Sequence, residues 1–173
     1  MRDFARTVGP CVGDLPRAPR RPETMNRSEL LQTVASAIPA EGPFASIEVL
    51  GDRIRCHAKD APAPAWYELA ATDDGIIVRF ATPDRWLSES VETDLMHFGD
   101  PIEELIEEEL AELGWNGSVP TVRHFRDDAR LYTFENTVPT TPEQASETAR
   151  LFLLAYEQAF RALGDVGGGD EDE

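Results

Sequence analysis

Lysine is almost missing from this sequence, although charged residues are plentiful. Of the 16 basic residues only Lys59 is a lysine, and the other fifteen are arginines. Against them stand 33 acidic residues, which gives a formal net charge of −17 at pH 7. Binding to the phosphates of any DNA or RNA needs a basic surface. The composition therefore disfavours sequence-independent nucleic-acid binding, and no nucleic-acid partner is expected.

The acidic excess has two interpretations. A dense carboxylate shell keeps a protein hydrated in molar salt, and the scarcity of lysine fits such an adaptation, although a GC-rich genome also favours arginine over lysine. Alternatively, the acidic surface attracts a basic partner. We favour the first interpretation and expect a halophilic protein that works in a salt-adapted cytoplasm.

Cysteines and long apolar runs are also scarce. The two cysteines, Cys11 and Cys56, form no CxxC pair or disulfide framework, which favours a reducing, cytoplasmic location. No apolar run approaches the roughly 18 residues that a membrane-spanning helix needs. Arg20 and Arg21 are followed by a proline and polar residues, which is not typical of a signal peptide. We expect a cytoplasmic protein with no membrane partner.

Residue types that catalyse reactions or bind metals do not gather in a recognisable motif. His57, His97 and His124 are far apart in the chain, and a metal site would need the fold to bring His97 and His124 to Cys56 and a carboxylate. No nucleophile elbow or glycine-rich phosphate loop is present. The sequence thus predicts no catalytic, cofactor-binding or metal-binding residue, and a protein that is not an enzyme.

The best-defined element is the stretch GDPIEELIEEELAELGW at residues 99–115. Asp100 and Glu103 form a capping-box pattern around Pro101, which suits the first helical position. Apolar residues recur at spacings of three and four, and glutamates fill most other positions. The pattern predicts a helix over 101–113 with one buried and one anionic face. A cation site on the anionic face is the alternative to a solvated surface.

Periodicity and turn residues divide the rest of the chain into further elements. Helices are expected over 29–38 with Ser28 as cap, over 82–97, and over 142–163 with Thr141 and Gln144 as a capping box. The segment 82–97 is alternatively one helical turn followed by a strand over 91–97. Strands are expected over 46–50, 53–59, 66–71, 76–81, 119–125 and 129–138. Strands in consecutive hairpins predict an α+β fold, an antiparallel sheet of about six strands with helices on one face.

The two ends of the chain differ from its middle. Residues 1–24 carry a net charge of +2 and four prolines without any periodicity, so we expect them to be disordered; Met25 is an alternative start of the protein. Residues 165–173 are glycine-rich and acidic, and we expect disorder there too. Between them, residues 25–164 are expected to form a single domain.

The run RLYTFENTVPTTPEQASETARLFLLAYEQAF at residues 130–160 joins a strand to a Thr-Pro-Glu helix opening and a long amphipathic helix. This run resembles the closing segment of YbjN-type proteins, which share the type III secretion chaperone-like fold. The order of elements over residues 28–163 is similar to that fold, although segment 82–98 and the glutamate face of 101–113 depart from it. The resemblance implies a non-enzymatic binding, regulatory or chaperone-like protein, often dimeric.

The apolar stripe of the helix over 142–163 is wider than one small sheet face needs. We therefore expect another protein, or a second copy in a homodimer, to cover part of it. Leu151, Leu154 and Tyr156 are the candidate contacts. Trp66 and Tyr67, neighbours on one strand, point to opposite faces, so one of them extends this candidate interaction surface.

The leading functional hypothesis is a protein-interaction domain. The alternative is a small-molecule-binding domain or an enzyme with a pocket between the sheet and the helices. That alternative predicts a buried polar group such as His97 or His124 inside a cavity next to the helix over 82–98.

Overall fold

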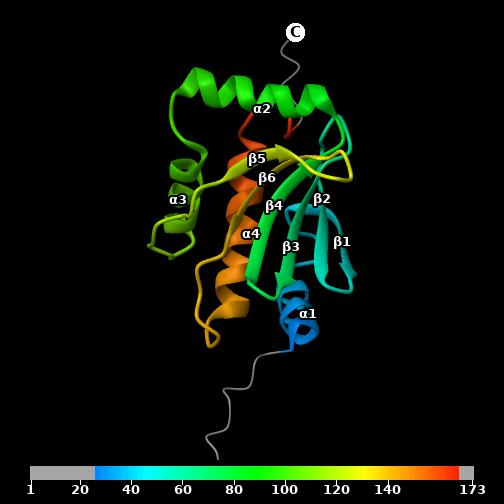
Figure 1. Cartoon of the computed structure of the whole chain (residues 1–173), viewed down its shortest axis with the longest axis vertical. Helices are drawn as coiled ribbons and strands as arrows, with labels where there is room; N and C mark the ends of the chain where they lie inside the picture. The colour runs from blue at the N-terminus through cyan, green and yellow to red at the C-terminus, as the bar shows by residue number, and fades with distance from the viewer. Residues whose placement is uncertain (1–25, 168–173) are drawn as a thin grey trace, which may run out of the picture.

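The computed structural model describes residues 26–167, so the predicted basic segment 1–24 lies outside the described residues. The described residues form a six-stranded antiparallel sheet of order β1-β2-β3-β4-β6-β5 and four helices, which confirms the α+β prediction (Figure 1). The strands are β1 (Phe44–Leu50), β2 (Arg53–Ala58), β3 (Trp66–Thr72), β4 (Gly75–Thr82), β5 (Arg123–Arg126) and β6 (Tyr132–Thr137). The helices are α1 (Arg27–Ala37), α2 (Arg85–Phe98), α3 (Ile102–Glu112) and α4 (Ala145–Arg161).

Helix α4 lies at the centre of the core. Phe160 stacks on Phe80 of β4 with the ring centroids 4.7 Å apart, and the Tyr156 hydroxyl donates a 2.8 Å hydrogen bond to the Asn136 side-chain oxygen of β6. Helices α1 and α3 also pack against α4 and lie on either side of it (Figure 1). The wide apolar stripe of α4 is therefore covered within the chain.

Helix α2 crosses the end of the sheet instead of packing on its face (Figure 1). It is one continuous helix, with Leu87 and Val91 buried, which decides against the alternative of a turn followed by a strand. At the far end of α4, the Gly164 N–H donates a 2.6 Å hydrogen bond to Asp94 of α2. A Cβ on Gly164 would lie 2.5 Å from the Ser90 hydroxyl, so this close approach requires glycine. Helix α2 thus lies across the end of the sheet, and its Leu87 and Val91 belong to the same core as residues of the other three helices.

The predicted N-terminal caps of α1, α3 and α4 are wrong. Asn26, not Ser28, caps α1, because its side chain accepts a hydrogen bond from the Ser28 N–H. The cap position of α3 is Pro101, without a side-chain hydrogen bond, and α4 begins only after Gln144. Residues 142–144 form a turn before α4, so the Thr-Pro-Glu opening precedes the helix instead of starting it.

Two glutamates of α3 bind the loop that follows the helix. The Glu103 carboxylate accepts a 2.7 Å hydrogen bond from the Val122 N–H, and Glu107 accepts one of 2.8 Å from the Val119 N–H. These amides are therefore bonded to side chains and not to a neighbouring strand, so β5 begins at Arg123 instead of residue 119. Part of the anionic face of α3 is structural.

The acidic tail begins later than the predicted residue 165. Val166 is 1% exposed and belongs to the core, and the Asp165 N–H donates a hydrogen bond to the Ser90 hydroxyl. Residues 168–173 lie outside the described residues. No helix within 26–167 is long and apolar enough to cross a membrane.

Candidate interaction surface

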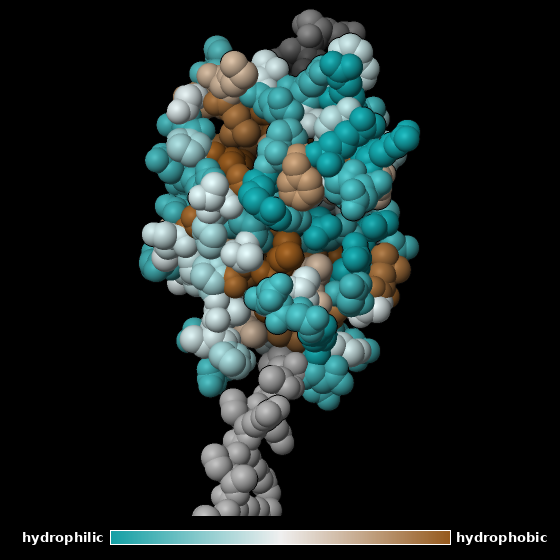
Figure 2. Space-filling view, viewed as in Figure 1, coloured by the Kyte–Doolittle hydropathy of each residue, from teal (hydrophilic) through white to brown (hydrophobic). Residues whose placement is uncertain are grey.

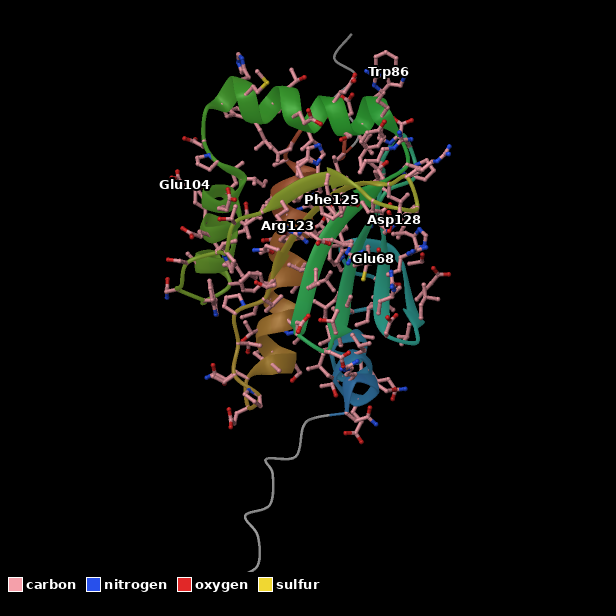
Figure 3. All side chains as sticks on the ribbon, viewed as in Figure 1. Glu68, Trp86, Glu104, Arg123, Phe125 and Asp128 are labelled. Atoms are coloured by element: carbon pink, nitrogen blue, oxygen red, sulfur yellow. The ribbon has the colours of Figure 1, made fainter. Side chains whose placement is uncertain are left out.

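One face of the sheet is free of helices within the described residues. Helices α1 and α4 contact the other face, and in Figure 1 the strands β4 and β6 lie in front of α4, so the view looks onto the helix-free face. Tyr67 and Leu69 of β3 point into the core, whereas Trp66 and Glu68 alternate with them and point to the helix-free face. Figure 3 places Glu68 and Arg123 on this face.

A row of alternating charges crosses the helix-free face. Each of the six strands contributes one charged residue, and the register places these residues opposite one another from strand to strand. From β1 to β5 the members of this charge row are Glu48, Arg55, Glu68, Arg79, Glu135 and Arg123. Acid and base alternate without a break, so each register neighbour of a carboxylate is an arginine, which is the favourable cross-strand arrangement.

The two inner carboxylates of the charge row are buried and each contacts two arginines. Glu68, with a side chain 2% exposed, lies 3.2 Å from Arg55 and 3.9 Å from Arg53. Glu135, 6% exposed, lies 3.3 Å from Arg79 and also pairs with Arg123. Buried carboxylates are tolerated only when they are paired in this way. The ion pairs of the charge row therefore join β2 to β3, and β6 to both β4 and β5, on the polar side of the sheet.

The two edges of the sheet differ strongly. Strand β5 has four residues, RHFR, of which two are arginines. Strand β1 has seven residues, FASIEVL, with Glu48 as its single charge and no proline. Val49 and Leu50 are 46% and 42% exposed. Short, charged edges resist pairing with a further strand, whereas a long, largely apolar edge invites it.

The outward side of β1 carries unused hydrogen-bonding groups. Leu50 and Arg53 close a two-residue turn between β1 and β2. The alternation of an antiparallel ladder then directs the N–H and C=O groups of Ile47 and Val49 away from β2. Within residues 26–167 no other element bonds these groups. Among the described residues, β1 is the outermost strand at this rim of the sheet, and apolar residues are exposed along the rim (Figures 1 and 2).

The five residues predicted to form an interaction surface do not lie together. Tyr67, Leu151 and Tyr156 are 1%, 8% and 0% exposed and belong to the core, so the prediction is wrong for them. Leu154 is partly buried and packs against the same core. Trp66 alone lies on the helix-free face, where the Arg55 guanidinium sits 4.6 Å from its ring centroid.

The histidines occupy separate places. His57 lies 3.0 Å from the Glu48 carboxylate, His124 lies 2.7 Å from Glu92, and His97 is exposed at the end of α2. His97 and His124 are both exposed, so neither is the buried polar group that the alternative hypothesis predicts. Burial raises the pKa of Cys56 to about 12. Within residues 26–167 no three His, Cys, Asp or Glu side chains are grouped so that they could hold a metal ion.

Glu157 is a buried acid outside the charge row. Its residue is 3% exposed, and its carboxylate lies 3.3 Å from Arg161 on the next turn of α4. Burial raises the pKa of Glu157 above its ordinary value of 4.5, and the opposing effect of Arg161 does not cancel the rise. The folded state therefore holds this proton more tightly than the unfolded state, so the contribution of Glu157 to stability falls as the pH rises from 4.5 through the raised pKa.

Replacing Glu157 with glutamine should stabilise the protein at neutral pH by on the order of 1 kcal/mol, because glutamine buries no charge. The gain should vanish well below pH 4.5, where the wild-type carboxyl is itself protonated. Urea unfolding of both proteins across this pH range measures the difference between their free energies of unfolding. The effect of pH on the rest of the acidic surface is the same in both proteins and drops out of this difference. A gain in stability that does not depend on pH would contradict the raised pKa of Glu157.

Comparison of the chain with protein-family models, with curated proteins and with solved structures finds no match. The resemblance to YbjN-type proteins therefore stays a prediction.

Proposed function

We propose that this chain is a non-enzymatic protein-interaction domain that binds an extended segment of another protein along β1. The observation that carries the proposal is the open edge of the sheet at residues 46–50, beyond the register shift between Phe44 and Ser46. This stretch has one charge, and within residues 26–167 nothing bonds the outward main-chain groups of Ile47 and Val49. When a strand adds to such an edge, main-chain hydrogen bonds supply affinity and the alternating side chains supply specificity. Capture of extended segments suits a chaperone-like or regulatory role.

The rest of the fold supports binding at this edge. The Arg55–Glu68 ion pair joins β2 to β3, and β1 pairs with β2 in a regular register from Ser46 to Leu50, so the edge is ordered before a partner arrives. The net charge of −17 opposes association of two like chains in dilute buffer and attracts a basic partner. In the salt-rich cytoplasm that the composition predicts, charges are screened within about 3 Å. Main-chain hydrogen bonds would then supply most of the affinity.

Replacing Val49 with proline should abolish partner binding and preserve the fold. Proline removes an outward N–H and places its ring in the path of an added strand, but it removes no hydrogen bond to β2. Val49→Thr is the matched control, because it keeps the N–H and a β-branched side chain. Tagged protein purified at high salt from its own cells and examined by native mass spectrometry should retain the same stoichiometric protein with wild type and Val49→Thr, and lose it with Val49→Pro.

Thermal unfolding followed by circular dichroism verifies that Val49→Pro is folded. A folded Val49→Pro protein that retains its partner would overturn binding at the β1 edge. A bound small molecule in place of a protein would support the alternative, a small-molecule-binding domain or enzyme.

A further inference from the structure

The charge row ends at the open edge on a carboxylate that is not matched by arginine. Glu68 and Glu135 each contact two guanidinium groups. Glu48 contacts none within residues 26–167, because its register partner Arg55 is directed to Glu68 at 3.2 Å. The Glu48 side chain is 52% exposed, and its Oε2 atom lies 3.0 Å from the His57 Nε2 atom. The alternation of acid and base therefore ends, at the edge proposed to bind the partner, on a carboxylate without a contacting arginine.

We infer that the segment bound by β1 carries an arginine or lysine opposite Glu48, with an apolar residue on each side of it. This inference rests on the proposed function and adds the chemistry of the partner. A basic side chain at that position continues the alternation of the charge row by one strand. An acidic side chain there would stand directly opposite Glu48, which is destabilising.

Strand β2 shows which side chains fit against β1. On the inner side of β1, Arg55 stands opposite Glu48, while Ile54 and Cys56 stand opposite Val49 and Ile47. The outer side of β1 presents the same three side chains to an added strand, because successive residues alternate between the two faces of the sheet, not between its two edges. The same pattern of apolar, basic and apolar residues is therefore complementary on the outer side.

A second copy of β1 does not provide this pattern. The sequence FASIEVL contains no basic residue, so pairing of two β1 strands leaves both Glu48 carboxylates without an arginine. Charge complementarity thus favours a basic segment of a different protein over a symmetric dimer.

Two matched peptides test the inference. One alternates valine and threonine around a central arginine, and its twin has glutamate at the centre. Each is titrated into the isotope-labelled full chain in dilute buffer and in molar KCl, and the amide shifts of Ile47 and Val49 report binding. We expect the arginine peptide to bind about fivefold more tightly in dilute buffer, with a smaller preference in molar KCl. Glu48→Gln should lose most of this preference and keep only the part that the net negative charge of the chain supplies.

The controls separate the inference from the proposed function. Equal binding of both peptides to the wild type, lost in Val49→Pro, would leave strand addition intact and overturn the inferred charge. No shift at Ile47 or Val49 at millimolar concentrations of either peptide would overturn the proposed function as well. Concentration-dependent self-association in sedimentation, lost in Val49→Pro, would assign the edge to a second copy and overturn the inference of a different partner.

Discussion

Replacing Arg79 with methionine should destabilise the protein by about 2 to 3 kcal/mol, near the lower end of the range for breaking a buried ion pair. The Arg79 side chain is 18% exposed and lies 3.3 Å from Glu135, which is 6% exposed. Without Arg79, Glu135 stays buried beside Arg123 alone, which is 69% exposed and screened by solvent. Arg123→Met is the matched control, and an exposed partner of this kind should cost less than about 1 kcal/mol. Urea unfolding measures the loss in free energy of unfolding for both variants.

The double variant Arg79→Met with Glu135→Leu tests whether the charges are coupled. Once Glu135 is also apolar, no buried carboxylate is left short of a partner, so most of the lost stability should return. Arg123 is then free to point into solvent. Additive losses in the double variant would show that the charge row is a surface pattern with no energetic coupling.

Leu151→Asp should prevent folding, at a cost of about 4 kcal/mol or more. Leu151 is 8% exposed and packs in the core around α4, so an aspartate there would be a buried charge without a partner. Leu154→Asp is the control on the same helix. Leu154 is only partly buried, so the carboxylate of an aspartate at this position would reach water. Circular dichroism and urea unfolding should show a folded Leu154→Asp protein and an unfolded or strongly destabilised Leu151→Asp protein.

The outcome of Leu151→Asp also decides between two interpretations of the α4 stripe. A folded Leu151→Asp protein that had lost an association partner would return the stripe to the role of an interface. Loss of folding would agree with its place in the core of the chain.

The order and type of the elements were predictable because they depend on local patterns. Apolar spacing and turn residues lie within one element, so the α+β class and the antiparallel sheet follow from the sequence. The helix starts were less predictable. Asp100 and Glu103 have the spacing of a capping box, yet Glu103 bonds the Val122 N–H of a loop that lies beside α3 only in the folded chain.

The candidate site could not be predicted because it depends on which strands are neighbours. Glu48, Arg55, Glu68 and Arg79 each alternate with apolar residues along their own strands, so their direction was predictable. Strand β6, not β5, pairs with β4, and this pairing brings Glu135 opposite Arg79. The pairing is a property of the whole sheet. The apolar stripe of α4 was assigned to a partner for the same reason, since its cover by α1 and α3 is a tertiary arrangement.

The central position of α4 has a consequence for how the chain folds during its synthesis. The strands β1 to β4 leave the ribosome before α2, α3, β5 and β6, and α4 comes after all of these. Until α4 emerges, Phe80 and the other core residues of β4 lack the helix that covers them, and the open edge of β1 is present at the same time. The nascent chain therefore passes through a stage with an uncovered apolar sheet and an unpaired edge, the combination that promotes aggregation. At low ionic strength, repulsion between the negative charges of neighbouring nascent chains opposes their aggregation at this stage.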